Sequence, residues 1–162
     1  MERLLIVSNR LPVSVVKRPR SLKLQPSAGG LATGLSSFYQ SHRSMWVGWP
    51  GLPADRLSAD EKAEAVESLR ARDCHPVFLS RADVDGYYHG FCNRAIWPLF
   101  HYFSSFAEYE KGQWQAYKKA NEAFADVVTA VAEPGDRIWI HDYQLMLLPR
   151  LLRRRMADAS IG

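Results

Sequence analysis

Continuous apolar runs alternate along this chain with stretches that carry a helical repeat. The run from Leu4 to Val7 has no polar interruption, which is typical of a strand buried on both faces of a parallel sheet. Further strands are predicted at 45–49, 75–79 and 137–140. Because these strands alternate with helical segments over short joints, the sequence predicts an α/β fold with a doubly wound, mostly parallel sheet.

Helical patterns occupy the connections between these strands. Ser58 and Glu61 form a capping box, and Ser80 followed by Asp83 indicates another helix start. Pro149 lies inside the last helical pattern, so that helix is predicted to kink or to start late. The predicted helices lie at 31–39, after 58, after 80, at 114–131 and at 145–155.

One long connection carries β-prone residues instead of a helical repeat. Its two short runs, 13–16 and 22–24, flank the turn at 18–21. We therefore expect a β-hairpin insertion around 13–25 that overhangs the ligand crevice.

Length and composition favour one globular domain over 1–162. The chain has 162 residues, 47% of them hydrophobic and 12% aromatic, which is neither a disordered nor a fibrous composition. The run Leu4 to Val7 is far too short for a signal peptide or a membrane span, so a cytoplasmic protein without membrane contact is expected. The two cysteines, Cys74 and Cys92, are too few for a disulfide framework or a cysteine metal site.

The charge balance favours anionic ligands without distinguishing among them. There are 21 basic and 17 acidic residues, for a net charge of +4. The triple arginine at 153–155 follows a helical pattern and is expected to complement a helix C-terminus in solvent. Base-stacking and groove-reading motifs are missing, so nucleic-acid binding gains little support.

Polar residues follow two of the predicted strands at their carboxyl ends, where an open parallel sheet keeps its ligand crevice. Arg10 either offers its planar guanidinium to a phosphate or carboxylate, or forms a surface ion pair. Asp142 either accepts hydrogen bonds from sugar hydroxyls or caps the following helix. His141 either orients a ligand and moves a proton, or is a structural residue beside a buried strand.

Glycines and aromatic residues supply two further candidate features. Gly29 and Gly30 stand at the amino end of the predicted helix 31–39, where they either present backbone amides to an anion or allow a tight helix entry. Trp97 lies in an aromatic segment with Tyr87 and Tyr88, which forms either an apolar wall against a sugar ring or part of the core.

Five separated motifs, in order, link these residues to one family. They are LLIVSNRLPV from Leu4, SAGGLATGL from Ser27, WVGWPG from Trp46, DGYYHGFCNRAIWPLFHY from Asp85 and IWIHDYQLMLLP from Ile138. Together they cover nearly the whole chain and resemble the N-terminal domain of the trehalose-6-phosphate synthases.

The resemblance implies the Rossmann-like N-terminal half of a GT-B glycosyltransferase, in which two such domains face each other across a cleft. Glucose would pass from UDP-glucose to glucose 6-phosphate with retention, giving α,α-trehalose 6-phosphate and UDP. Neither a metal nor another cofactor is implied. The departing phosphate oxygen would help to deprotonate the attacking hydroxyl, so no carboxylate nucleophile is needed.

The resemblance also assigns residues by motif. The glucose 6-phosphate site would consist of Arg10 on the phosphate, Tyr88 donating to it, Asp142 on the hydroxyls, Trp97 shaping the pocket, and Trp49 in preference to Trp46. Gly29 and Gly30 would lie against the diphosphate of UDP-glucose.

The C-terminal, donor-binding domain of the family lies outside these residues, so the fragment is expected not to turn over alone. A non-catalytic regulatory relative or a sugar-phosphate-binding module is the alternative, and a homo-oligomer is left open.

Overall fold

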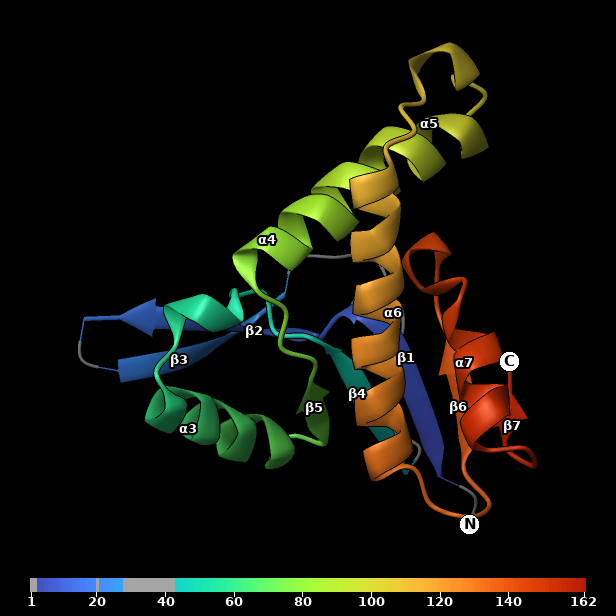
Figure 1. The fold of residues 1–162 in the computed structure, drawn as a ribbon. Coiled ribbons are helices and arrows are strands. Elements are labelled where there is room, and N and C mark those ends of the chain that lie inside the picture. Colours follow the sequence, from blue (N-terminus) through green and yellow to red (C-terminus); the bar gives the residue numbers. More distant parts are fainter. Residues whose placement is uncertain (1–2, 20, 28–42) are drawn as a thin grey trace.

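The computed structural model describes residues 3–19, 21–27 and 43–162, and in this part of the chain a five-stranded parallel sheet forms the centre (Figure 1). Its strand order is β5-β4-β1-β6-β7, so the chain builds outward from β1 in one direction and then restarts beside β1 in the other. This order places a topological switch point between β1 and β6, where doubly wound sheets bind ligands. The strands are β1 (Leu4–Arg10), β4 (Ser44–Trp49), β5 (Cys74–Pro76), β6 (Arg137–Ile140) and β7 (Ser160–Ile161).

Strand β1 is buried on both faces, as its unbroken apolar run predicts. Leu5 and Val7 belong to one hydrophobic cluster, whereas Ile6 belongs to another on the opposite face. All three side chains are 0% exposed. Because side chains alternate across a strand, a strand at the centre of a layered fold needs apolar residues at every position.

Helices cover both faces of the sheet. One face packs against α6 (Lys111–Val131), α7 (Leu148–Arg155) and a long helical segment, and α3 (Ala59–Arg70) packs against the other (Figure 1). The long helical segment consists of α4 (Arg81–Val84), the π-helix η2 (Asp85–Ile96) and α5 (Trp97–Phe100). Three short 3-10 helices complete the described part: η1 (Ala54–Arg56), η3 (Ser104–Phe106) and η4 (Tyr143–Leu145).

Local sequence signals place several of these elements. The capping boxes at Ser58 and Ser80 are both present, and α3 and α4 begin at the following residues. Helix α7 starts late, with Pro149 in its first turn, where a missing N–H breaks no helical bond. The helix predicted at 31–39 lies outside the described residues.

The strand predicted at 75–79 is shorter than expected and begins earlier. Only β5 (Cys74–Pro76) pairs with β4, at the edge of the described sheet. Pro76 has no N–H to donate, and after the backbone bond from Val77 N to Gly48 O at 2.8 Å the chain leaves the sheet. The predicted bounds of this strand were wrong because apolar content alone does not show where a strand stops pairing with its neighbour.

The predicted hairpin is present beyond the end of β1. Strand β2 (Val13–Arg18) pairs antiparallel with β3 (Ser21–Pro26) in a separate two-stranded sheet. Val15 is buried against the same cluster as Ile6. The hairpin is thus anchored beside the carboxyl end of β1.

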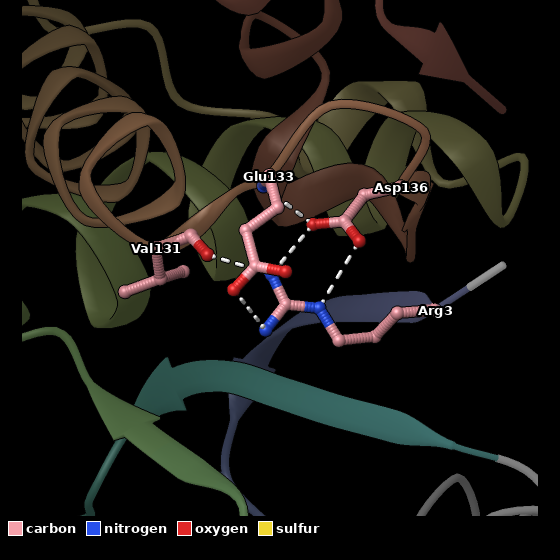
Figure 2. A network of polar contacts seen from close by, with 4 residues as sticks. All are labelled: Arg3, Val131, Glu133 and Asp136. Atoms are coloured by element: carbon pink, nitrogen blue, oxygen red, sulfur yellow. Dashed lines mark hydrogen bonds and ion pairs between the residues drawn. The ribbon is translucent and has the colours of Figure 1, made fainter. Parts of the chain in front are cut away.

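A partly buried network of charged side chains ties the amino end of β1 to the loop between α6 and β6 (Figure 2). Arg3 donates to both carboxylate oxygens of Asp136, from Nε at 3.0 Å and Nη2 at 2.7 Å, and to the carbonyl of Val131 at 2.9 Å. Glu133 adds an ion pair to Arg3 at 3.3 Å, and its backbone N–H donates to Asp136 at 2.7 Å. These contacts hold β1 and β6 side by side at their amino ends. The ligand crevice of such a sheet lies at the opposite, carboxyl ends of the strands.

None of the helices in the described residues is both long and apolar enough to cross a membrane.

Candidate functional site at the carboxyl ends of β1 and β6

The two central strands end together, and each releases polar residues at the same rim of the sheet. Regular pairing of β1 with β6 runs to Val7 and Ile140, and the N–H of His141 then donates to the carbonyl of Val7 at 2.8 Å. On the other side, the pairing of β1 with β4 shifts register between Val7 and Arg10. Such a bulge bends the strand end and redirects the side chains that follow it.

Ser8 and Gly48 build this bulge. The Ser8 hydroxyl donates to the carbonyl of Arg10 at 2.8 Å and accepts the indole N–H of Trp46 at 2.7 Å. A side-chain carbon at Gly48 would lie 2.8 Å from Leu11 N, 2.9 Å from Arg10 C and 2.9 Å from Ser8 O. Only glycine allows β4 to approach the bent end of β1 so closely.

Arg10 leaves the bulge as an exposed side chain with few partners. Its guanidinium lies 5.2 Å from the ring centroid of Trp49, and Nη2 donates to Ser14 Oγ at 3.1 Å. Among the described residues no carboxylate forms an ion pair with it, so the surface ion pair considered from the sequence is not formed there. The guanidinium is preorganised by an aromatic face and keeps free donors for an anion.

Trp49 and Trp46 differ in what their indole groups do. Trp46 is 1% exposed and its N–H is used by Ser8. Trp49 is 8% exposed, and its buried Nε1 has no hydrogen-bond partner among the described residues. A buried donor without an acceptor is costly, so Nε1 of Trp49 is available to a ligand or to water at the rim.

The long helical segment is tied to β1 by a buried hydrogen bond. The Tyr87 hydroxyl, on a side chain that is 0% exposed, donates to Asn9 Oδ1 at 3.1 Å. Burial raises the pKa of Tyr87 well above its usual value, so the group remains a donor. The bond from Tyr87 thus helps to position Asn9 at the end of β1.

The π-helix η2 packs closely on α6 at two glycines. A side-chain carbon at Gly86 would lie 2.8 Å from Ala116 Cβ, and one at Gly90 would lie 2.9 Å from Gln113 Cγ. The wide helical turn is visible at its end, where the N–H of Trp97 donates to the carbonyl of Cys92, five residues earlier. π-Helical turns occur frequently at functional sites.

Asp142 has an unusual backbone conformation. Its φ of 75° and ψ of 165° lie in a region that is populated almost only by glycine, at a cost of about 1–3 kcal/mol for other residues. Its Oδ1 accepts the N–H of Tyr143 at 2.8 Å, so Asp142 caps η4 as one reading of the sequence expects. The carboxylate belongs to an exposed residue, and its capping bond uses only one oxygen.

Electrostatic effects show that Tyr88, Cys92 and Asp142 share one neighbourhood. Burial, the negative charge of Asp142, and the nearby Cys92 and Tyr88 together raise the pKa of Tyr143 to about 12. Burial and, second, the charge of Asp142 also raise the pKa of the Cys92 thiol. The thiol is therefore neutral and structural, as expected for an ordinary reduced cysteine.

His141 is half-buried beside this neighbourhood. Burial lowers its pKa more than the negative charge of Asp142 raises it. Its ring centroid lies 4.2 Å from that of Trp139, and its buried Nε2 has no partner in the part of the chain that the structure describes. The lowered pKa favours the neutral form of the ring.

The expected site residues thus lie in two groups along one rim. Arg10 and Trp49 stand together at β1 and β4. Tyr88, on η2, and Asp142, after the end of β6, both act on the phenol of Tyr143. The bond from Tyr87 to Asn9 connects the two groups.

The ring contact of Trp97 lies within its own helical segment. Trp97 lies at the start of α5, is 43% exposed and stacks on His101 with ring centroids 4.0 Å apart. Gly29 and Gly30 lie outside the described residues. In the part of the chain that is described, no group of three or more His, Cys, Asp or Glu side chains could hold a metal ion.

Sequence reasoning missed the residues that support the site. Ser8 and Gly48 build the bulge, and Tyr117 and Asn121 contact η4 from α6. The available signal was Asn121, a polar residue in the otherwise apolar stripe of 114–131.

Comparison with known proteins identifies the family. The model of glycosyltransferase family 20 matches residues 2–162. A bifunctional trehalose-6-phosphate synthase/phosphatase from Thermoproteus tenax is 44% identical over 99% of this chain, which spans only 22% of that relative.

Solved structures agree. A UDP-forming α,α-trehalose-phosphate synthase from Burkholderia xenovorans in complex with glucose-6-phosphate superimposes with a TM-score of 0.73 at 28% identity, over 99% of this chain and 32% of the other. A structure described as "Trehalose-6-phosphate from E. coli bound with UDP-2-fluoro glucose" has a TM-score of 0.74 at 28% identity, with coverage of 99% and 32%. These neighbours share the Rossmann-like, GT-B half predicted from the sequence. The chain belongs to glycosyltransferase family 20.

Proposed function

We propose that this chain provides the acceptor-binding half of a retaining glycosyltransferase that transfers glucose from UDP-glucose to glucose 6-phosphate. The products would be α,α-trehalose 6-phosphate and UDP. Family membership supports the proposal, as do similar structures that hold glucose-6-phosphate in one case and UDP-2-fluoro glucose in another. The chain spans about a third of each of these solved chains, so the donor half would come from the remaining part of such an enzyme.

One observation carries the proposal: an exposed guanidinium, unpaired with any described carboxylate, stands at the rim that also carries an exposed aspartate. Glucose 6-phosphate is a dianion attached to a polyol. A guanidinium binds phosphate through two parallel N–H donors, and a carboxylate accepts hydrogen bonds from sugar hydroxyls. In such a ligand the guanidinium would suit the phosphate and the carboxylate would suit the hydroxyls.

In this proposal Arg10 binds the acceptor phosphate, with Tyr88 donating to it and Trp49 contributing its unused indole N–H. Asp142 accepts from the acceptor hydroxyls through the oxygen that its cap leaves free. Trp97 would shape the far wall of the acceptor pocket, and Gly29 and Gly30 would approach the donor diphosphate.

The proposed mechanism needs no protein nucleophile. Acceptor and donor would meet on one face of the donor sugar, and the departing phosphate oxygen would help to remove the proton from the attacking hydroxyl. The contribution of this half is orientation, which lowers the barrier by holding the acceptor hydroxyl in reacting position. Preorganised donors such as the guanidinium of Arg10 cost no reorganisation during the reaction.

Calorimetric titration of the chain with glucose 6-phosphate tests the proposal. We expect binding in the millimolar range or tighter, and Arg10→Met should weaken it at least about tenfold, because a charge-assisted bond contributes about 1.5–3 kcal/mol. The matched control is Arg18→Met, which removes an exposed arginine from the hairpin and should leave binding unchanged. Absence of heat at millimolar ligand, from a chain that is folded by circular dichroism, would contradict the proposal, as would equal affinity of Arg10→Met and wild type.

A further inference from the structure

The strained backbone at Asp142 must be held from both sides. On the preceding side, the N–H of His141 is bound to the carbonyl of Val7 at 2.8 Å, which fixes the end of β6. On the following side lies the short turn η4. A conformation that is unfavourable for a non-glycine residue persists only where surrounding contacts determine it.

The hydroxyl of Tyr117, on α6, contacts both ends of η4. It donates to the carbonyl of Tyr143 at 2.8 Å and accepts the N–H of Met146 at 3.1 Å. The side chain is 1% exposed, and burial raises the pKa of its phenol, so the group stays protonated and can donate. Removing this one oxygen would leave a carbonyl and an N–H of the turn without partners.

Asn121, one helical turn further along α6, holds the middle of the same segment. Its Nδ2 donates to the carbonyl of Gln144 at 3.1 Å and to the carbonyl of Tyr117 at 3.0 Å. The side chain is 0% exposed. A buried polar residue on an apolar helix face carries a desolvation cost, and these bonds offset the part that belongs to Nδ2. The buried Oδ1 has no partner among the described residues.

We infer that Tyr117 and Asn121 are positioning residues for Asp142: by binding η4 from α6 they aim the Asp142 carboxylate at the acceptor hydroxyls. The inference deepens the proposed function and rests on it. Both side chains are buried, so they act through the turn and not by touching the ligand. Binding of the acceptor hydroxyls would therefore depend on η4. Binding of the phosphate would not, because Arg10 is held by β1 and β4.

A comparison of glucose 6-phosphate binding with inorganic phosphate binding therefore tests the inference. A general loss of stability would weaken both to the same extent. Tyr117→Phe should weaken glucose 6-phosphate binding about three- to tenfold. It should leave the weaker binding of inorganic phosphate, which needs Arg10 and not Asp142, unchanged within twofold. In the Asp142→Asn background the same substitution should add no further loss, because the carboxylate that it positions is gone.

The experiment uses calorimetry of the chain with glucose 6-phosphate and with inorganic phosphate, together with amide hydrogen exchange. Tyr102→Phe is the matched control, since Tyr102 is 97% exposed and its hydroxyl holds no turn. The N–H of Met146 should exchange faster in Tyr117→Phe than in wild type. Asn121→Leu, of similar volume, repeats the test at the middle of the turn if the first variant does not fold.

Equal losses for glucose 6-phosphate and phosphate, or additive losses in the double variant, would overturn the inference. Failure of the wild-type chain to bind glucose 6-phosphate would count against the proposed function itself. In that case the hydrogen-exchange experiment alone tests whether Tyr117 holds the turn. A selective rise at Met146 supports the hold on the turn, and unchanged protection there overturns it.

Discussion

Replacing Gly48 by alanine should damage the site through the backbone of β1. The added Cβ would lie 2.8–2.9 Å from three main-chain atoms, of Leu11, Arg10 and Ser8, a separation that real Cβ atoms essentially never show. These atoms cannot yield easily. The N–H of Leu11 is bound to the carbonyl of Trp49 at 3.0 Å, and the carbonyl of Arg10 is bound to the hydroxyl of Ser8 at 2.8 Å.

The magnitude follows from opposing terms. Overpacking of a rigid site costs about 1–3 kcal/mol. Alanine regains about 0.4–1 kcal/mol, because its unfolded chain is less flexible than that of glycine. We expect a net loss of about 1–1.5 kcal/mol in the free energy of unfolding, which lowers the melting temperature of a domain of this size by about 2–6 °C. Because Arg10 leaves the same bulge, phosphate binding should weaken as well.

Thermal and urea denaturation measure this loss, with Gly112→Ala as the matched control. Gly112 lies in the first turn of α6, and an added Cβ there would meet no atom within 4 Å. That substitution should be neutral or stabilising by up to about 1 kcal/mol. If Gly48→Ala melts at or above the wild-type temperature, the close approach of β4 to β1 does not constrain the site, and the explanation of the bulge is wrong.

Three further predictions concern stability. Burial raises the pKa of Asp136, but the hydrogen bonds from Arg3 and from the backbone of Glu133, together with the positive charge of Arg3, outweigh burial in sum, so the pKa is lowered. Stability from this pair should be present above about pH 4 and lost as the pH falls through the lowered value, and Asp136→Asn should flatten that acid limb of a urea-denaturation series. Tyr87→Phe leaves the Oδ1 of Asn9 without its donor and should cost about 1–2 kcal/mol by urea denaturation, so a cost near zero would show that the bond does not secure β1. Ser58→Ala should cost about 1 kcal/mol in thermal melts and Ser58→Gly only a few tenths, whereas equal losses would contradict the cap.

Local sequence signals predicted much of the fold because they report local structure. The unbroken run at Leu4 to Val7 predicted a strand buried on both faces, and both capping boxes predicted helix starts to the residue. Pro149 predicted either a kink or a late start, and α7 starts late. In each case the cause, a side-chain period, a cap or a missing N–H, lies within a few residues of its effect.

The long helical segment shows a feature that local sequence signals did not predict. The residues Asp85 to Ile96 read as an aromatic cluster, yet they form a π-helix whose glycines fit against α6. The sequence of the segment does not show how closely α6 packs against it. The length of β5 escaped prediction for the same reason, since pairing with β4 decides where it ends.

The sequence by itself determined which residues leave the carboxyl ends of the strands, and it placed Arg10 and Asp142 among them. Tertiary structure alone decided that β1 and β6 are neighbours, that Gly48 bends the path to Arg10, and that Asp142 adopts a φ of 75°. The physical reason is that strand order, close backbone approach and strain depend on contacts between residues far apart in the chain. A side-chain pattern describes one helix or strand at a time and does not show how close another helix or strand lies.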